Sequence, residues 1–217
     1  MPNQNREPLC IVLGAMPIST REARDIRRMA EEPGNLLICA DAGLEIAQRY
    51  GITPHLIMGD FDSMECPPET DIPVRTFPVE KDDSDSMLAA KEGLERGFRR
   101  FLFYGSLGGR LDHTIANISM LRYVLDFGAT GWILSEENCV TLIQNTSLTL
   151  EWDERYPHLS VFSYEKEARG VVVEGGKYTP QSHSLDNVFP LGLSNSIVGE
   201  RATVTVEEGV LLIVRAK

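Results

Sequence analysis

The chain has 217 residues, a length that allows one large domain or two small ones. Its formal net charge of −11 would repel a nucleic-acid strand, and the sequence has no basic run to offset that charge, so we expect no nucleic-acid partner. No apolar run approaches the roughly 20 residues that a membrane-spanning helix needs, and residues 1–8 lack the apolar core of a signal peptide. We therefore expect a cytoplasmic protein with no membrane partner.

Short apolar runs alternate with helical patterns in the first half of the chain, which is typical of a mostly parallel sheet covered by helices. These runs are continuously apolar and too short for helices, so they are predicted to be buried strands. The predicted strands are residues 9–13, 36–40, 55–59, 101–104 and 132–134.

Helix boundaries are marked by capping patterns. Ser19 with Glu22 three residues later is the pattern of a capping box, and a glycine follows the predicted end of each of two later helices. The predicted helices run from Ser19 to about residue 31, from Ser84 to the residue before Gly97, and over residues 111–127.

The pattern changes after about Gln144, because no convincing amphipathic helix remains and apolar residues alternate with a period of two. The clearest runs are residues 148–150, 159–162, 171–173, 202–206 and 210–214. We therefore expect two domains. Residues 1–144 would form an α/β domain with a mostly parallel, Rossmann-like sheet, and residues 145–217 would form a small antiparallel β-sandwich.

The four cysteines are scattered, with no C-x-x-C pair. Cys10 and Cys39 lie in apolar runs, where a reduced thiol behaves as a small hydrophobic group. We expect all four, including Cys66 and Cys139, to be reduced and structural.

Two aspartates follow the predicted strand at residues 55–59. Asp60 and Asp62 are two positions apart, and alternate side chains of an extended backbone project to the same side, so both carboxylates could face one Mg²⁺. Their loop leaves the carboxyl end of a strand, where open α/β sheets place ligands. The alternative is a solvated turn, since Gly, Asp and Ser are turn formers.

A second acidic cluster occupies residues 81–85, where a helix is predicted to begin. Ser84 or Asp83 could simply cap the exposed amides of that helix. Three acids in four positions exceed the need of one cap, however, and Lys81 could hold a phosphate oxygen as a point charge. We expect part of this cluster to face a ligand.

The third cluster, residues 105–113, joins a glycine-bearing turn to a helix N-terminus, where backbone amides commonly meet anions. Arg110 offers a two-pronged contact to phosphate, and Asp112 offers a further oxygen ligand. The spacing is not that of a Walker A loop. His113 is interpreted as a hydrogen-bonding residue at the helix start rather than a general base, because no Ser or Cys nucleophile stands in an obvious relation to it.

Carboxylates repel one another and resist burial, so several of them in one cleft indicate a divalent cation and the polyphosphate that it carries. The three clusters together predict a phosphate-handling enzyme.

The order and spacing of these motifs resemble those of the thiamine pyrophosphokinase family over nearly the whole chain. The motifs are Asp41-Ala42-Gly43, Gly59-Asp60-Phe61-Asp62-Ser63, Lys81-Asp82-Asp83-Ser84-Asp85, Gly105-x-x-Gly108-Gly109-Arg110-Leu111-Asp112-His113 with Asn117, and Gly192-Leu193-Ser194-Asn195. The resemblance implies an α/β domain followed by a β-sandwich, a homodimer with shared active sites, and transfer of diphosphate from ATP to the hydroxyethyl oxygen of thiamine.

The resemblance also implies roles for individual residues. Asp60, Asp62 and Asp85 would hold Mg²⁺ as the cofactor, and with Asp112 they would form the catalytic acidic set. The residues that would contact ATP or thiamine are Asp41, Lys81, Asp82, Arg110, His113, Asn117, Ser194 and Asn195.

Two positions depart from the family pattern. Ser84 stands where the family usually has threonine, which keeps the hydroxyl, and the stretch before Ser194 lacks an aromatic residue found in some relatives. The aromatic side chain that would stack on thiamine is therefore left open among Phe189, Tyr178 and Trp152.

Three other functions remain open. Diphosphate transfer to another alcohol, such as a pterin carbinol, could use the same metal and ATP groups. A non-catalytic nucleotide sensor would not need its acids, which are intact here. A metal-dependent phosphohydrolase would release phosphate without any acceptor.

Overall fold

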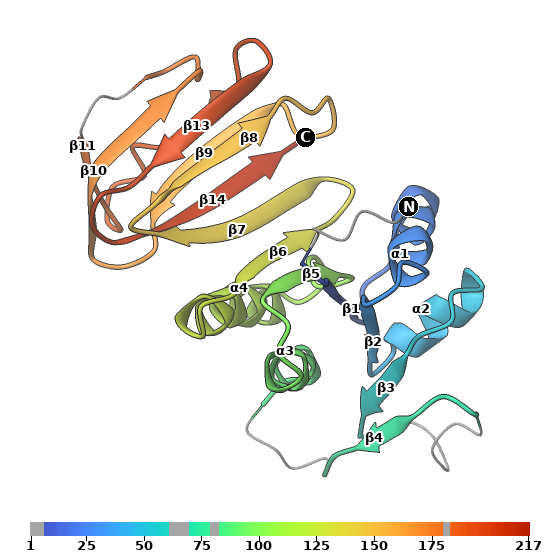
Figure 1. The fold of residues 1–217 in the computed structure, drawn as a ribbon. Helices are drawn as coiled ribbons and strands as arrows, with labels where there is room; N and C mark the ends of the chain where they lie inside the picture. The colour runs from blue at the N-terminus through green and yellow to red at the C-terminus, as the bar shows by residue number, and fades with distance from the viewer. Residues whose placement is uncertain (1–6, 61–69, 79–82, 180–182) are drawn as a thin grey trace. The chain divides into compact units, whose positions relative to one another are not determined.

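The computed structural model describes residues 7–60, 70–78, 83–179 and 183–217 (Figure 1). The chain divides into two compact units, Met1–Glu136 and Glu137–Lys217. The two units are described separately. The predicted division into functional domains at residues 144 and 145 stays a prediction.

The first unit contains a parallel sheet whose strands lie in the order β6-β5-β1-β2-β3-β4. These strands are β1 (Cys10–Leu13), β2 (Leu36–Ala40), β3 (Leu56–Gly59), β4 (Val74–Thr76), β5 (Arg100–Tyr104) and β6 (Thr130–Leu134). The prediction of a mostly parallel sheet is confirmed. The three-residue strand β4 was not predicted, because it is short and partly exposed and has no apolar run.

The helices of this unit are α1 (Thr20–Ala30), α2 (Gly43–Arg49), α3 (Asp85–Glu95) and α4 (Leu111–Asp126). The predicted capping box is present, because Ser19 Oγ accepts from the Glu22 backbone N at 3.3 Å and Glu22 Oε2 accepts from the Ser19 backbone N at 2.6 Å. Gly97 and Gly128 follow α3 and α4 with φ of 89° and 70°, as expected for glycines that end helices. Sequence analysis did not predict the short helix α2.

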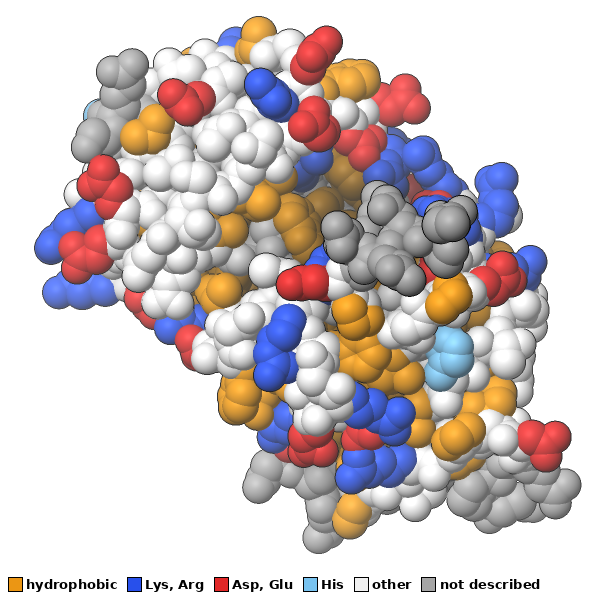
Figure 2. Space-filling view, viewed as in Figure 1, with side chains coloured by type: hydrophobic (Ala, Val, Ile, Leu, Met, Phe, Trp, Pro, Cys, Tyr) orange, Lys and Arg blue, Asp and Glu red, His pale blue; other side chains and the backbone are white. Residues whose placement is uncertain are grey.

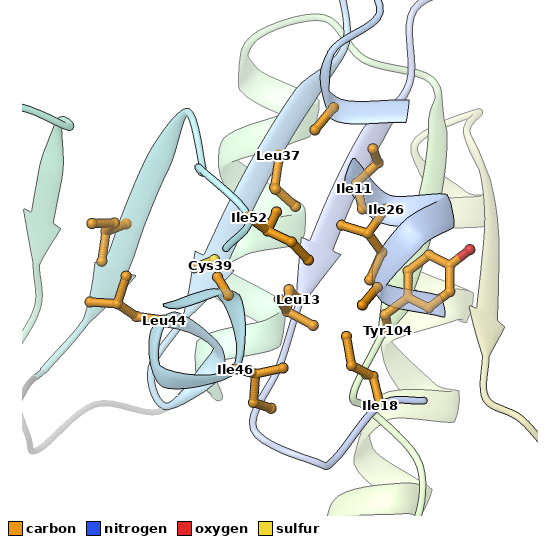
Figure 3. Close-up of a cluster of buried hydrophobic side chains, with 14 of the residues drawn as sticks. Ile11, Leu13, Ile18, Ile26, Leu37, Cys39, Leu44, Ile46, Ile52 and Tyr104 are labelled. Carbon is orange, nitrogen blue, oxygen red and sulfur yellow. The ribbon is translucent and has the colours of Figure 1, made fainter. Parts of the chain in front are cut away.

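The central strands are covered on both faces, α1 and α2 on one and α3 and α4 on the other (Figure 1). Alternate residues of the buried strands therefore point to different helix layers. Figure 3 shows Ile11 and Leu13 of β1 in one cluster with Ile26 of α1 and Leu44 of α2. This core fixes the strand ends from which the loops of the site emerge.

The second unit consists of two sets of antiparallel strands. The strands of the first lie in the order β12-β9-β14-β7 and those of the second in the order β11-β10-β13-β8. These strands are β7 (Asn138–Gln144), β8 (Ser147–Glu151), β9 (His158–Ser163), β10 (Glu167–Glu174), β11 (His183–Asp186), β12 (Asn195–Ser196), β13 (Arg201–Thr205) and β14 (Val210–Ala216). The prediction of a small antiparallel β-sandwich is confirmed, and strand β7 pairs with β14 within this unit.

Cys10, Cys39 and Cys139 are free and buried, and burial raises the pKa of each thiol to about 12. These thiols therefore remain protonated at neutral pH and act as apolar packing groups. Cys66 lies outside the described residues. No helix in the described part of the chain is long and apolar enough to cross a membrane.

Candidate functional site

A cavity of about 320 Å³ lies in the first unit at the carboxyl ends of β1, β2 and β5. Strand β1 lies between β2 and β5, and the chain continues outward from it on both sides, so the strand order reverses at this point. Open α/β sheets bind ligands at such a reversal, because the loops that leave the two neighbouring strands diverge there. Position in the fold thus marks this cavity as the candidate site.

Two glycines allow the loops after β1 and β5 to cross in direct contact. The Gly14 backbone N donates to the Tyr104 carbonyl at 2.8 Å, and the Met16 backbone N donates to the Gly105 carbonyl at 2.9 Å. Gly105 has φ of 63°, and a Cβ at this residue would lie 2.7 Å from the Gly14 carbonyl oxygen. A side chain there would push the loops apart, so this part of the cavity requires glycine.

Asp41 lines the cavity directly after β2. Its φ of 49° is unusual for a residue other than glycine, and its backbone N donates to the Met58 carbonyl at 2.7 Å. Two residues later, a Cβ on Gly43 would lie 2.0 Å from the Leu13 carbonyl oxygen. The Asp-Ala-Gly motif therefore makes a sharp turn that leads from β2 into α2 beside the cavity.

The second acidic cluster serves several purposes. Asp83 pairs with Lys91, with 2.6 Å between Oδ2 and Nζ, and Ser84 caps α3 by accepting from the Met87 backbone N at 3.3 Å. Asp85, the first residue of α3, lines the cavity. The capping interpretation thus holds for Ser84, while Asp85 faces the cavity and its contact with a ligand stays a prediction.

The first acidic cluster is only partly described. Asp60 is half-buried and follows β3, but it does not appear among the described residues that line the cavity. Asp62 lies outside the described residues, as do Lys81 and Asp82 of the second cluster. The roles predicted for these residues stay predictions.

The third cluster lies at the N-terminus of α4, and its Arg110 and His113 line the cavity. Arg110 donates to both carboxylate oxygens of Asp112, from Nε at 3.1 Å and from Nη2 at 2.6 Å. These bonds, with one from the His113 backbone N at 3.0 Å, hold the pKa of Asp112 below its usual value. Both side chains of the ion pair are largely exposed, so the pair can open when a stronger anion approaches Arg110.

Asn117 of α4 supports the glycine-bearing turn through a side-chain hydrogen bond. Its side chain is buried on α4, and Nδ2 donates to the Ser106 carbonyl at 2.8 Å. Ser106 is itself buried, and its hydroxyl donates to the Tyr104 carbonyl at 3.3 Å. The predicted ligand-binding residue Asn117 therefore holds the turn to the helix.

Sequence analysis missed part of this cavity. Gly14, Ala15 and Met16 line it where β1 ends, Ser86 lines it from the first turn of α3, and Ala116 lines it from the second turn of α4. Their small or apolar side chains carry no chemical signature. The available signal was positional, because Gly14 directly follows the first predicted strand and the first strand of such sheets commonly borders the ligand site.

A second cavity, of about 550 Å³, lies in the second unit. Its walls are mainly apolar side chains of β9, β10, β11 and residues 191–193. The polar residues that line it are Lys177, Tyr178, Thr179, His183 and Asn195. A largely apolar cavity with a few convergent polar groups is typical of a small-molecule site.

The predicted residues Ser194 and Asn195 lie at this second cavity or beside it. The Asn195 amide is buried and bonds to the backbone of Tyr178, accepting from its N at 2.9 Å and donating to its carbonyl at 2.6 Å. Ser194 adopts φ of 63°, and its backbone N donates to Ser160 Oγ at 3.1 Å. Of the three aromatic candidates for stacking, Tyr178 lines the cavity.

The surface charge is mixed on the face shown in Figure 2, where Lys and Arg side chains are interspersed with Asp and Glu and with hydrophobic groups. Arg110, paired with Asp112, carries a positive charge at the candidate site. It lies where the N-terminus of α4 adds a partial positive charge of its own.

Comparison with known proteins identifies the family that this geometry resembles. Residues 30–130 match the family model of the thiamin pyrophosphokinase catalytic domain. Thiamine pyrophosphokinase of Bacillus subtilis is 25% identical over 186 residues, which cover 83% of this chain and 87% of that protein. The predicted family resemblance is confirmed. The matched region contains the cavity residues from Ala40 to Asn117, whereas Gly14, Ala15 and Met16, like Ser194 and Asn195, lie outside it.

Solved structures share the fold over almost the whole chain. The crystal structure of the Bacillus subtilis thiamine pyrophosphokinase has a TM-score of 0.84 at 23% identity and covers 97% of this chain and 99% of that one. The thiamin pyrophosphokinase from Geobacillus thermodenitrificans has a TM-score of 0.81 at 24% identity and covers 97% of each chain. The two-unit architecture is therefore that of these enzymes.

Proposed function

We propose that this protein transfers diphosphate from ATP to the hydroxyethyl oxygen of thiamine and releases AMP. The family model and the relative from Bacillus subtilis support this activity. The observation that carries the proposal is the cavity at the reversal of strand order, where an acid, a glycine-bearing turn and an arginine meet at a helix N-terminus. This combination suits a metal-bound polyphosphate.

The phosphates of ATP would bind at the turn formed by residues 105–109 and at the N-terminus of α4. The backbone amides of this turn and the helix dipole favour an anion there. Arg110 would exchange the Asp112 carboxylate for phosphate oxygens, using the same two-pronged geometry. The loop contacts made by Gly14, Gly105 and Asn117 keep this surface in place before ATP arrives, which lowers the cost of binding.

We propose Mg²⁺ as the metal that ATP brings to the site. Among the described residues, no three His, Cys, Asp or Glu side chains are grouped to hold a metal. Magnesium nevertheless fits, because it commonly binds through one or two carboxylates together with water and substrate phosphates. Asp85 and Asp60 would provide carboxylate oxygens, with Asp62 as a further proposed ligand. When bound, Mg²⁺ would neutralise charge on the phosphate oxygens.

The chemical step needs positioning more than covalent assistance from the protein. The hydroxyethyl oxygen of thiamine attacks the β-phosphorus of ATP, the bond from that phosphorus to the oxygen of AMP breaks, and the alcohol proton is lost. We assign Asp85 as the carboxylate that accepts this proton, because it lines the cavity at the start of α3. Arg110 would stabilise the charge on the transferred group.

Thiamine would bind at the cavity of the second unit, with Ser194, Asn195 and Tyr178 at its rim. Tyr178 is the aromatic residue that we propose to contact the thiamine rings, since Phe189 and Trp152 do not occur among the described residues that line the cavity. Thiamine carries a permanent positive charge on its thiazolium, and the face of an aromatic ring attracts such a cation.

We further propose a cytoplasmic homodimer with active sites shared between two chains. The motivating observation is unpartnered apolar surface on both units. Leu111 and Ile115 of α4 are 72% and 56% exposed, and Val188 and Phe189 of the second unit are 87% and 66% exposed. A second copy of the chain would cover such surface, and free buried cysteines agree with a reducing compartment.

The molecule that accepts diphosphate distinguishes the proposed function from the three alternative functions. Purified protein should form AMP when it is given ATP, Mg²⁺ and thiamine. AMP formation with a pterin carbinol but not with thiamine would identify the alternative diphosphokinase. Phosphate release without any acceptor would identify a phosphohydrolase, and nucleotide binding without turnover would identify a sensor. The family match does not favour these three alternatives.

A further inference from the structure

Two segments beside the cavity of the second unit, residues 175–178 and 195–198, pair as a short antiparallel ladder. Gly176 and Ile197 form its bridge. One backbone N–H on each segment donates to a carbonyl of the other, at 2.8 and 2.9 Å. The ladder fixes the position of the first segment up to the residue before Tyr178.

The side chain of Asn195 extends this ladder by one step. Its Oδ1 accepts from the Tyr178 backbone N at 2.9 Å, and its Nδ2 donates to the Tyr178 carbonyl at 2.6 Å. The same Oδ1 also accepts from the Ser196 backbone N at 2.9 Å. Asn195 is 7% exposed, so these bonds form away from water, where their loss is costly. The amide thus takes the place of a peptide group in pairing with Tyr178.

Tyr178 combines a fixed backbone with an accessible ring. Its side chain borders the cavity, and the residue is 59% exposed. The ammonium of Lys177 lies 5.4 Å from the centre of the ring, so a cationic ligand at this face would displace the ammonium from the ring. A ring held in this way needs little further ordering when a cationic ligand binds, and affinity rises because that entropic cost is reduced.

We propose that Asn195 is a positioning residue that sets the affinity for thiamine through Tyr178, without contacting thiamine itself. This role rests on the proposed function, because it takes the ligand to be thiamine. Three bonds to backbone groups already engage the Asn195 amide, and the residue that it holds is the exposed aromatic at the rim.

Coupling between the two residues tests this role. Calorimetric titration with thiamine, in the presence of Mg²⁺ and a non-hydrolysable ATP analogue, would give the Kd for the wild type, Asn195→Ala, Tyr178→Ala and the double variant. We expect each single change to raise Kd about ten-fold, and we expect the double variant to bind no more weakly than Tyr178→Ala. If the two losses multiply in the double variant, Asn195 acts independently of Tyr178 and the proposal is wrong.

A second variant disturbs the hydrogen bonds between Asn195 and Tyr178 but leaves the Asn195 side chain in the protein. A Cβ on Gly176 would lie 2.9 Å from Asn195 Nδ2 and 3.0 Å from the Tyr178 carbonyl oxygen. Gly176→Ala should therefore reproduce the rise in Kd caused by Asn195→Ala. Unchanged affinity in Gly176→Ala would contradict the proposal.

Two further measurements separate a positioning role from general damage to the protein. For Asn195→Ala, kcat at saturating thiamine and the KM for ATP should stay within about two-fold of the wild type, because the phosphate site belongs to the first unit. A collapse of kcat would instead indicate such damage and overturn the positioning role. If the wild type itself binds no thiamine and forms no AMP, the proposed function fails. The wild-type titration thus distinguishes that failure from failure of the positioning role of Asn195.

Discussion

Replacing Asn117 with alanine should weaken both the fold of the first unit and its nucleotide site. The change removes the 2.8 Å bond from Nδ2 to the Ser106 carbonyl and leaves that buried carbonyl without its donor. A buried polar group stranded in this way costs about 1–3 kcal/mol. For a protein of this size, a loss of about 2 kcal/mol lowers Tm by about 4–8 °C.

The same change should impair the use of ATP. The turn that Asn117 holds carries the amides and the arginine proposed to bind phosphate, and a displacement of about 1 Å at such a site can reduce the rate by about 100-fold. We expect kcat/KM for ATP to fall by at least about ten-fold, measured as AMP formation at saturating thiamine.

A matched control lies on the same helix. Ser119 is exposed, and its hydroxyl donates to the Ile115 carbonyl at 3.2 Å, so Ser119→Ala should leave Tm and kcat/KM close to those of the wild type. The decisive measurement is thermal unfolding of Asn117→Ala without ATP. If Tm is unchanged while activity falls, Asn117 acts only by contacting the nucleotide, and the argument that it supports the turn is refuted.

Three further predictions concern the proposed catalytic residues and the dimer. Asp60→Asn should nearly abolish AMP formation and leave Tm within a few degrees of the wild type, because removing a loop carboxylate opens no cavity; near-normal turnover would exclude this residue from the metal site. Arg110→Lys keeps the charge but loses the two-pronged contact, so kcat/KM should fall by about ten-fold or more; equal activity would mean that Arg110 contributes only charge. Asp85→Asn chains and chains carrying both Ser194→Ala and Asn195→Ala, each inactive alone at low thiamine, should regain about a quarter of wild-type activity when refolded together, since half of the dimers are hybrids with one intact site each. Absence of recovery in a sample shown by light scattering to contain dimers would rule out shared sites.

Local sequence patterns determined most of the secondary structure. The period of the apolar residues distinguished the parallel sheet of the first unit from the antiparallel sheets of the second, because burial on both faces produces continuous apolar strands and burial on one face produces alternation. Capping residues such as Ser19 and Gly97 placed helix ends within a residue or two. Strand β4 and helix α2 escaped prediction because both are short and depend on tertiary contacts.

The sequence predicted the chemistry of the candidate site but not the contacts of its individual side chains. Runs of acids, a glycine-bearing turn and an arginine at a helix start indicated a phosphate site, and the family resemblance indicated the reaction. Sequence alone did not show that Asn117 and Asn195 direct their amides to backbone groups. It also did not rank Tyr178 above the other aromatic candidates.

The sequence by itself therefore determined the order of elements and the kind of chemistry, because apolar period, capping and charge are properties of neighbouring residues. Only the tertiary structure decided which loops meet. The strand order places the ends of β1 and β5 side by side although about 90 residues separate them along the chain. Hydrogen bonds such as that from Asn117 to Ser106 then assign each polar side chain either to the fold or to the ligand, and that choice depends on distances that no local pattern records.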